Sequence, residues 1–85
     1  MNNKQKGKAS KNLKTPPEIL HQLAIDAAPW IRYQAAQNPN TSIKTLEILA
    51  VDKCQHVRHN VLLNPNKTQL IERLPISNTY QSDPP

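Results

Sequence analysis

The chain has 85 residues and a net charge of +5, it is 36% hydrophobic, and it contains no Phe and one Trp. A chain of this length forms one small domain and cannot wall a deep active-site cleft with its own core. The single Gly and the single Cys exclude a glycine-rich phosphate loop, an internal disulfide framework and a cysteine-only zinc module. We therefore expect no enzyme, with no catalytic residues, no cofactor and no resident metal.

Residues 1–14 carry the whole net charge. They hold five lysines and no acidic residue, whereas the remaining six basic residues balance the six acidic ones. Ala9 and Leu13 are the main hydrophobic residues of this segment, too few to repay its ordering entropy. We predict that 1–14 is a disordered basic tail. It has no apolar run typical of a secretory signal, and no run of the chain reaches the length of a membrane span, so we expect a cytoplasmic protein.

Residues 15–66 consist of two units related by a shift of 26 residues without a gap. The first unit, 15–40, reads TPPEILHQLAIDAAPWIRYQAAQNPN, and the second, 41–66, reads TSIKTLEILAVDKCQHVRHNVLLNPN. Nine positions are identical: Thr15/Thr41, Leu20/Leu46, Leu23/Leu49, Ala24/Ala50, Asp26/Asp52, Arg32/Arg58, Asn38/Asn64, Pro39/Pro65 and Asn40/Asn66. A partial third unit follows over 67–74, and 75–85 is predicted to be an irregular tail.

Each unit is predicted to form two short helices. Thr15, with Pro16 after it and Glu18 three residues on, predicts a capping box at the start of the first helix. Apolar residues at helical spacing follow it, and a second helix is predicted near 30–37, ended by the Asn-Pro-Asn of 38–40. In the second unit, Val57, Val61 and Leu62 form the predicted apolar stripe of the second helix. Helices this short need neighbours that share a core, which is typical of a solenoid.

The segment NPNTSIKTLEILAVDKCQHVRHNVLLNPN closely resembles the leucine-rich repeat variant family. That family repeats an NP-x-T pattern, a Leu-x-x-Leu-Ala pair, an Asp and a Val-Arg pair in this order. The resemblance covers about 15–74 and implies an all-α, right-handed superhelix of paired short helices, here about two and a half repeats, distantly similar to HEAT units. The prototype carries clustered cysteines for an iron–sulfur group before its repeats. Residues 1–14 contain no Cys, so that cluster is not expected here.

The acidic and basic residues of the two units recur together. Arg32 follows Asp26 by six residues, and Arg58 follows Asp52 by six. We interpret the four residues as a structural ladder in which each Asp caps the second helix and each Arg pairs with its own or the next Asp. The alternative is a row of guanidinium groups that binds phosphates.

The second helices carry the candidates for partner binding, because their side chains differ between the units where the core does not. These candidates are Trp30, Tyr33, Gln37, His56, His59 and Leu63. Aromatic and imidazole groups three residues apart share a helix side and suit a peptide or stacked bases. The alternative interpretation is that Trp30 shields the first unit while the others fill gaps between helices.

Cys54, His56 and His59 also match metal-ligand spacing or a Cys-His nucleophile pair. The equivalent residues Ala28, Trp30 and Tyr33 provide no fourth ligand, and no third group orients a base, so neither site is expected.

We expect a non-enzymatic interaction module that binds a protein partner or associates with itself. The alternative is a nucleic-acid-binding protein that uses the basic segment and the second-helix face. Its candidate residues are Lys4, Lys6, Lys8, Lys11, Lys14, Arg32 and Arg58. The interpretation that competes with nucleic-acid binding is that the lysines form a solubilising extension.

Overall fold

The computed structural model describes residues 1–73, which form six helices and no strand. The helices are α1 (Asn3–Lys11), α2 (Pro17–Ala24), α3 (Pro29–Gln37), α4 (Ile43–Leu49), α5 (Gln55–Val61) and α6 (Lys67–Arg73). The two predicted helices per unit are confirmed, as is the single helix that opens the third unit. None of the described helices is long and apolar enough to cross a membrane. The predicted irregular segment 75–85, and Leu74 before it, lie outside the described residues.

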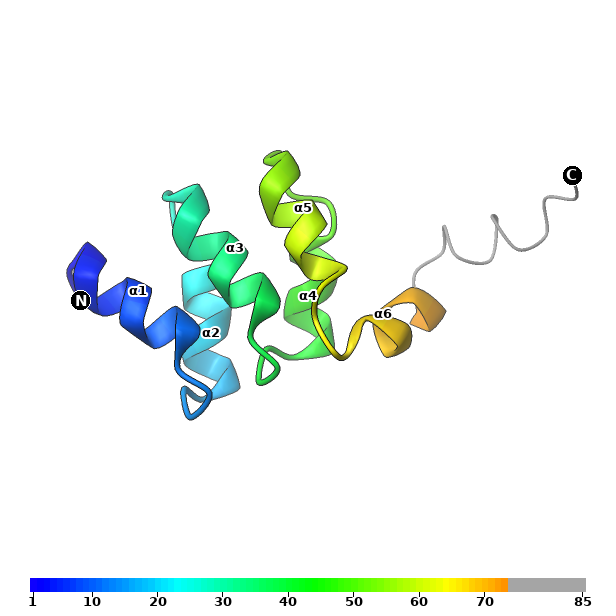
Figure 1. Ribbon diagram of the computed structural model, residues 1–85, viewed down its shortest axis with the longest axis horizontal. Coiled ribbons are helices and arrows are strands. Elements are labelled where there is room, and N and C mark those ends of the chain that lie inside the picture. Colours follow the sequence, from blue (N-terminus) through cyan, green and yellow to red (C-terminus); the bar gives the residue numbers. More distant parts are fainter. Residues whose placement is uncertain (74–85) are drawn as a thin grey trace, which may run out of the picture.

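The helices pack in two rows (Figure 1). Helix α3 contacts α1 on one side and α5 on the other, so α1, α3 and α5 form one row in chain order. Helices α2, α4 and α6 form the second row, in which α4 contacts both α2 and α6. Short helices of this kind are stabilised by such neighbour contacts rather than by their own propensity.

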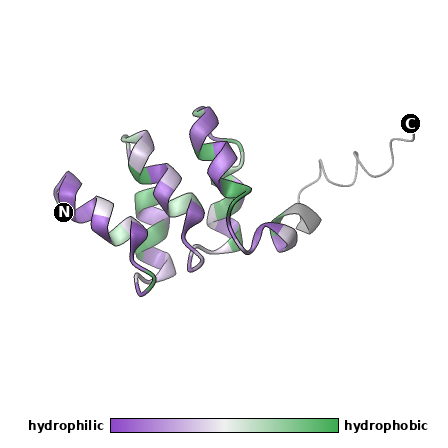
Figure 2. Ribbon diagram, in the orientation of Figure 1, coloured by the Kyte–Doolittle hydropathy of each residue, from purple (hydrophilic) through white to green (hydrophobic). Residues whose placement is uncertain are grey.

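The core lies between the two rows and is built from the predicted apolar stripes. Its fully or almost fully buried members are Leu20, Leu23, Ala24, Ile31, Ala35, Ala36, Leu46, Leu49, Val57, Val61 and Leu70. Figure 2 shows the hydrophobic segments along α2 to α5, with α1 mostly hydrophilic. Leu62 was expected in the α5 stripe, but its side chain is 51% exposed because none of the described helices packs beyond it.

Pro residues and Asn residues set the helix limits, but Thr15 does not act as predicted. Helix α2 begins after Pro16, which serves as its N-cap without a side-chain hydrogen bond, so the predicted capping box is wrong. The Thr15 hydroxyl instead donates to the Ala9 carbonyl at 2.7 Å, and Thr41 donates to the Ala35 carbonyl at 2.6 Å. Both threonines therefore join the end of one second helix to the start of the next unit.

The prediction that 1–14 is disordered is wrong, because Asn3–Lys11 forms α1 and packs on α3. Asn2 and Gln5 form a capping box at its start. Gly7 is buried so closely beneath Trp30 that a Cβ atom there would lie 2.7 Å from the Trp30 Cζ3 atom. Ser10 is fully buried, and its hydroxyl oxygen lies 2.8 Å from the Gly7 carbonyl oxygen and 2.7 Å from Gln34 Oε1. Tertiary packing and polar contacts thus order a segment that has few apolar side chains of its own.

The hydrogen bonds show that α1 is equivalent to α3 and α5 at the same 26-residue shift. Asn12, Asn38 and Asn64 each accept a hydrogen bond from the backbone amide two residues later. The Asn38 amide group donates to the carbonyls of Ser10 and Asn12, and that of Asn64 donates to the carbonyls of Ala36 and Asn38. Residues 1–14 therefore form the second half of a preceding unit rather than an appendage.

Candidate interaction surface at the open end of α5

A bidentate ion pair joins the two units on one side of the helix row. The Arg32 Nε atom donates to Asp52 Oδ2 at 2.8 Å, and Nη2 donates to Oδ1 at 3.2 Å. The Nη1 atom donates to the carbonyls of Asp26 and Ala27. Arg32 is 6% exposed, so this planar, forked arrangement holds the guanidinium away from solvent. Arg32 is thus occupied by structural contacts and is not free to bind phosphates.

Each Asp of the ladder also stabilises the turn before the next helix. Asp26 Oδ1 accepts the Ala28 amide at 2.9 Å, and Asp52 Oδ1 accepts the Cys54 amide at 2.8 Å. Ala28 and Cys54 are the N-caps, so each Asp orders the approach to the helix rather than capping it directly.

Lys6 performs for Asp26 the role that Arg32 performs for Asp52. The Lys6 Nζ atom lies 2.7 Å from Asp26 Oδ2. The hydrogen bond from Lys6, together with the one from the Ala28 amide, lowers the pKa of Asp26. For Asp52, burial acts to raise the pKa, but the hydrogen bonds from Arg32 and the Cys54 amide outweigh it, and the pKa is lowered. Lys6 was not predicted as a ladder residue, although it stands 26 residues before Arg32 in the sequence.

Arg58 breaks the pattern. Its Nη1 atom donates to the Asp52 carbonyl at 2.6 Å, as Arg32 does to the Asp26 carbonyl. Among the described side chains, those of residues 1–70, it has no carboxylate partner, since the two ion pairs there are those of Lys6 and Arg32. The Arg58 side chain is exposed. The ladder therefore ends on an exposed guanidinium.

Arg58, His59 and Leu62 define a surface that we call the open end of α5. All three are exposed, and Leu62 is 51% exposed. Their equivalents in α3 are Arg32 and Ala36, both buried, and Tyr33, which is half-buried. Their equivalents in α1 are Lys6, Gly7 and Ser10, of which the last two are buried. The same three positions are thus covered by the next helix in α1 and in α3, and are uncovered only in α5 among the described members of the row.

The predicted partner-binding residues do not form one face. Trp30 is 37% exposed and lies over Gly7, so the interpretation that it shields the first unit matches its position. Tyr33 and Gln37 line a small hollow between α1 and α3, with Ser10 and Lys11 on its other side. His56, His59 and Leu63 are exposed on or after α5. Only His59 of these candidates belongs to the open end.

The lysines of the N-terminal segment are ordered by α1 rather than spread along a chain. Lys4 and Lys8 occupy the positions of Trp30 and Gln34, which face the preceding helix in α3. Both are exposed, as are Lys11 and Lys14. Helices α1, α3 and α5 contain no acidic residue, whereas Glu18 and Glu47 lie in α2 and α4. Exposed positive charge is therefore concentrated on the α1 end of this row.

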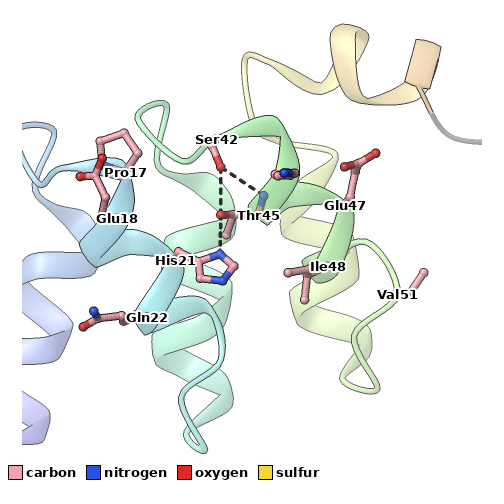
Figure 3. A pocket seen from close by; sticks show the side chains of 10 residues that line it. Pro17, Glu18, His21, Gln22, Ser42, Thr45, Glu47, Ile48 and Val51 are labelled. Carbon is pink, nitrogen blue, oxygen red and sulfur yellow. Dashed lines mark hydrogen bonds between the residues drawn. The ribbon is translucent and has the colours of Figure 1, made fainter.

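A groove between α2 and α4, with a volume of about 880 Å³, was not predicted from the sequence (Figure 3). Ile48 and Val51 contribute exposed apolar surface, and Glu18 and Glu47 are among its charged lining residues. The His21 Nδ1 atom lies 2.8 Å from Thr45 Oγ1, which also contacts Ser42 Oγ at 2.9 Å. Ile48 is an apolar residue of α4 that lies outside the predicted Leu stripe of that helix. This position was the signal for the groove that the sequence offered.

The described side chains do not assemble a metal site. Among them no group of three His, Cys, Asp or Glu residues is placed to hold an ion. Cys54 is half-buried against the core beside Asp52, while His56 and His59 are exposed on α5.

No family model matches the chain, and neither the curated proteins nor the solved structures contain a match. The resemblance to the leucine-rich repeat variant family remains a prediction from the repeated residues.

Proposed function

We propose that the protein is a non-enzymatic helical-repeat module, a short right-handed solenoid of the leucine-rich repeat variant type, that binds a protein partner. The open end of α5 is the observation that carries this proposal. Positions that are covered in α1 and α3 are exposed in α5, and they combine an apolar Leu62 with a charged Arg58 and an imidazole. Apolar and Arg side chains at the end of a helical stack are typical of a protein interface.

Position-specific photo-crosslinking in cells tests the proposal. A benzophenone amino acid is placed at Leu62 in the full chain, and the matched control carries it at Leu13, an exposed residue outside the row. We expect a crosslinked protein adduct from position 62 and none of the same mass from position 13. An equal pattern from both positions, or no adduct from position 62, would contradict partner binding at the open end.

Nucleic-acid binding is the second candidate, supported by the concentration of exposed lysines on α1. Lys4, Lys8 and Lys11 have no carboxylate partner among the side chains of residues 1–70. Three phosphate contacts would give a salt slope of about −2.7 for duplex DNA. Fluorescence anisotropy with duplex and single-stranded probes at two salt concentrations measures this slope, and replacement of the three lysines by Gln is expected to abolish binding. Equal binding by the substituted protein would exclude α1 as the site.

A further inference from the structure

We infer that the partner covers the open end of α5 with a helix that is preceded by a carboxylate, and that this carboxylate forms a bidentate ion pair with Arg58. The inference rests on the proposed function and specifies the chemistry of the partner. The open end would then form a third copy of a helix–helix interface that the chain already forms twice, between α1 and α3 and between α3 and α5.

The two existing copies define what such a partner provides. On α1, Lys6 is met by Asp26, which stands three residues before α3 begins. On α3, Arg32 is met by Asp52, which stands three residues before α5 begins. In each copy an Asn that follows the covering helix, Asn38 after α3 and Asn64 after α5, donates from its side chain to two carbonyls at the end of the covered helix. A covering segment therefore has an acid before its helix and an amide donor after it.

The α5 end offers the same set of groups to such a segment. The Arg58 Nη1 atom already contacts the Asp52 carbonyl, so the guanidinium is oriented as Arg32 is by the Asp26 carbonyl. Leu62 is larger than Ala36 and Ser10 at the equivalent positions. A covering helix at the same distance needs a small residue opposite Leu62, as Gly7 is opposite Trp30.

The sequence after α6 does not repeat the covering residues. In the 26-residue register, Asn78 stands where Asp52 does and Pro84 stands where Arg58 does. An Asn side chain carries no charge to pair with Arg58, and Pro has no backbone amide hydrogen to give to a helix. The sequence after α6 thus lacks the residues that the chain's own interface uses.

A second copy stacked head to tail does not supply them either. The face of α1 that would meet α5 carries Lys4 and Lys8, in place of the Trp30 and Gln34 of α3. In the packing of α3 on α1 these positions lie over the equivalents of His59 and Leu62. Two ammonium groups would therefore approach the surface that carries Arg58, and like charges at an interface oppose association. Charge complementarity therefore favours a different protein with an acidic helix start.

A peptide cut from this chain provides a direct probe of the open end. It consists of residues 50–66 with Cys54 replaced by Ser and with Asn60, the equivalent of the Gln34 that lies opposite Ser10, replaced by the smaller Ala to make room for Leu62. It carries a fluorescent label and is held helical by a hydrocarbon staple between positions 58 and 62. The staple lies on the face away from the contact and removes the peptide's own open end. In the full chain the α3 copy of the interface is occupied by α5, so the open end is the free copy for this peptide.

Fluorescence polarisation with the full chain gives the result. We expect saturable binding, about tenfold weaker for the Asp52→Asn peptide and about tenfold weaker for the Arg58→Gln chain. The two changes together are expected to cost no more than either alone, as residues of one pair do in a double-mutant cycle. Lys44→Gln removes one charge from α4 and is expected to leave binding unchanged, and circular dichroism checks that Arg58→Gln remains folded.

Equal binding of the peptides with and without the Asp52→Asn change, equal binding by the Arg58→Gln chain, or no saturable binding would overturn the inference. The crosslinking experiment separates this failure from failure of the proposed function. A protein adduct from position 62 without peptide binding means that a partner binds there through other chemistry. Peptide binding without an adduct means that the interface chemistry is right but the proposed function is wrong.

Discussion

Arg32 and Asp52 lie 20 residues apart in the sequence and form two hydrogen bonds of 2.8 and 3.2 Å across the boundary between repeat units. The pair is backed by the contacts of Arg32 with two carbonyls and of Asp52 with the Cys54 amide. Every buried polar side-chain atom among the described residues has a hydrogen-bond partner. The pair therefore fixes the register of neighbouring helices, and Arg58, which has no such pair with the side chains of residues 1–70, marks where the row is open.

Substitution of the two arginines is expected to have unequal effects on stability. Arg32→Met leaves the half-buried Asp52 without its charge partner and should lower the free energy of unfolding by about 2–4 kcal/mol. Arg58→Met removes an exposed side chain and should change it by less than about 0.5 kcal/mol. Urea unfolding followed by circular dichroism measures both values. Similar losses for the two variants would contradict a structural role for Arg32 that Arg58 does not share.

The buried asparagines should contribute more than their small volume indicates. Asn38→Ala removes three hydrogen bonds and leaves the Ser10 carbonyl at the end of α1 without its donor, whereas the Asn12 carbonyl keeps the Thr15 amide. We expect a loss of about 2–3 kcal/mol in unfolding free energy. Asn12→Ala is the control, because the exposed Asn12 side chain accepts only the Lys14 amide. A comparable loss for Asn12→Ala would show that the turn, rather than the bond between units, carries the effect.

The contact between Gly7 and Trp30 should be visible in the emission of the only Trp. In Gly7→Ala the new Cβ atom would lie 2.7 Å from Trp30 Cζ3 and 2.9 Å from Cη2, so the indole must move outward. We expect emission at longer wavelength and stronger quenching by iodide. Lys8→Ala also introduces an Ala into α1, but at the exposed position next to Gly7, and should leave the emission unchanged. An unchanged spectrum for Gly7→Ala would mean that α1 does not dock on α3.

Stability should fall in acid because the ladder carboxylates are ionised in the folded state. The pKa values of Asp26 and Asp52 are below the ordinary value of 3.8. Their contribution is complete above the pKa of the unfolded chain and is lost as the pH falls through the lower folded pKa. Chemical unfolding between pH 5 and about pH 2 should show this loss, and Arg32→Met should reduce it. An identical pH dependence in Arg32→Met would contradict the assignment to Asp52.

Neighbouring apolar residues of α5 should respond differently to truncation. Val61 is 1% exposed, and Val61→Ala should cost about 2 kcal/mol. Leu62 is 51% exposed, and Leu62→Ser should cost less than about 0.5 kcal/mol in the free protein. Thermal unfolding compares the two variants. A large loss for Leu62→Ser would show that Leu62 belongs to the core and would remove the apolar part of the open end.

The sequence by itself determined the helical class, the unit length and most of the core, because these depend on local periodicity. Leu20, Leu23, Leu46 and Leu49 repeat at helical spacing, and all four are buried. The Asp–Arg recurrence predicted a ladder, but it left open whether each Arg pairs with its own or the next Asp. The distance between the units decides this, and it places the Asp52 carboxylate against Arg32.

The tertiary structure alone decided the state of the N-terminal segment and the position of the interaction surface. Ala9 and Leu13 predicted too little apolar burial for residues 1–14, yet Gly7, Ser10 and Lys6 order the segment through close approach and hydrogen bonds to other units. Leu62 follows the apolar pattern and is exposed all the same. Burial depends on which helix comes next in space, and a pattern of residue types along one helix does not contain that information.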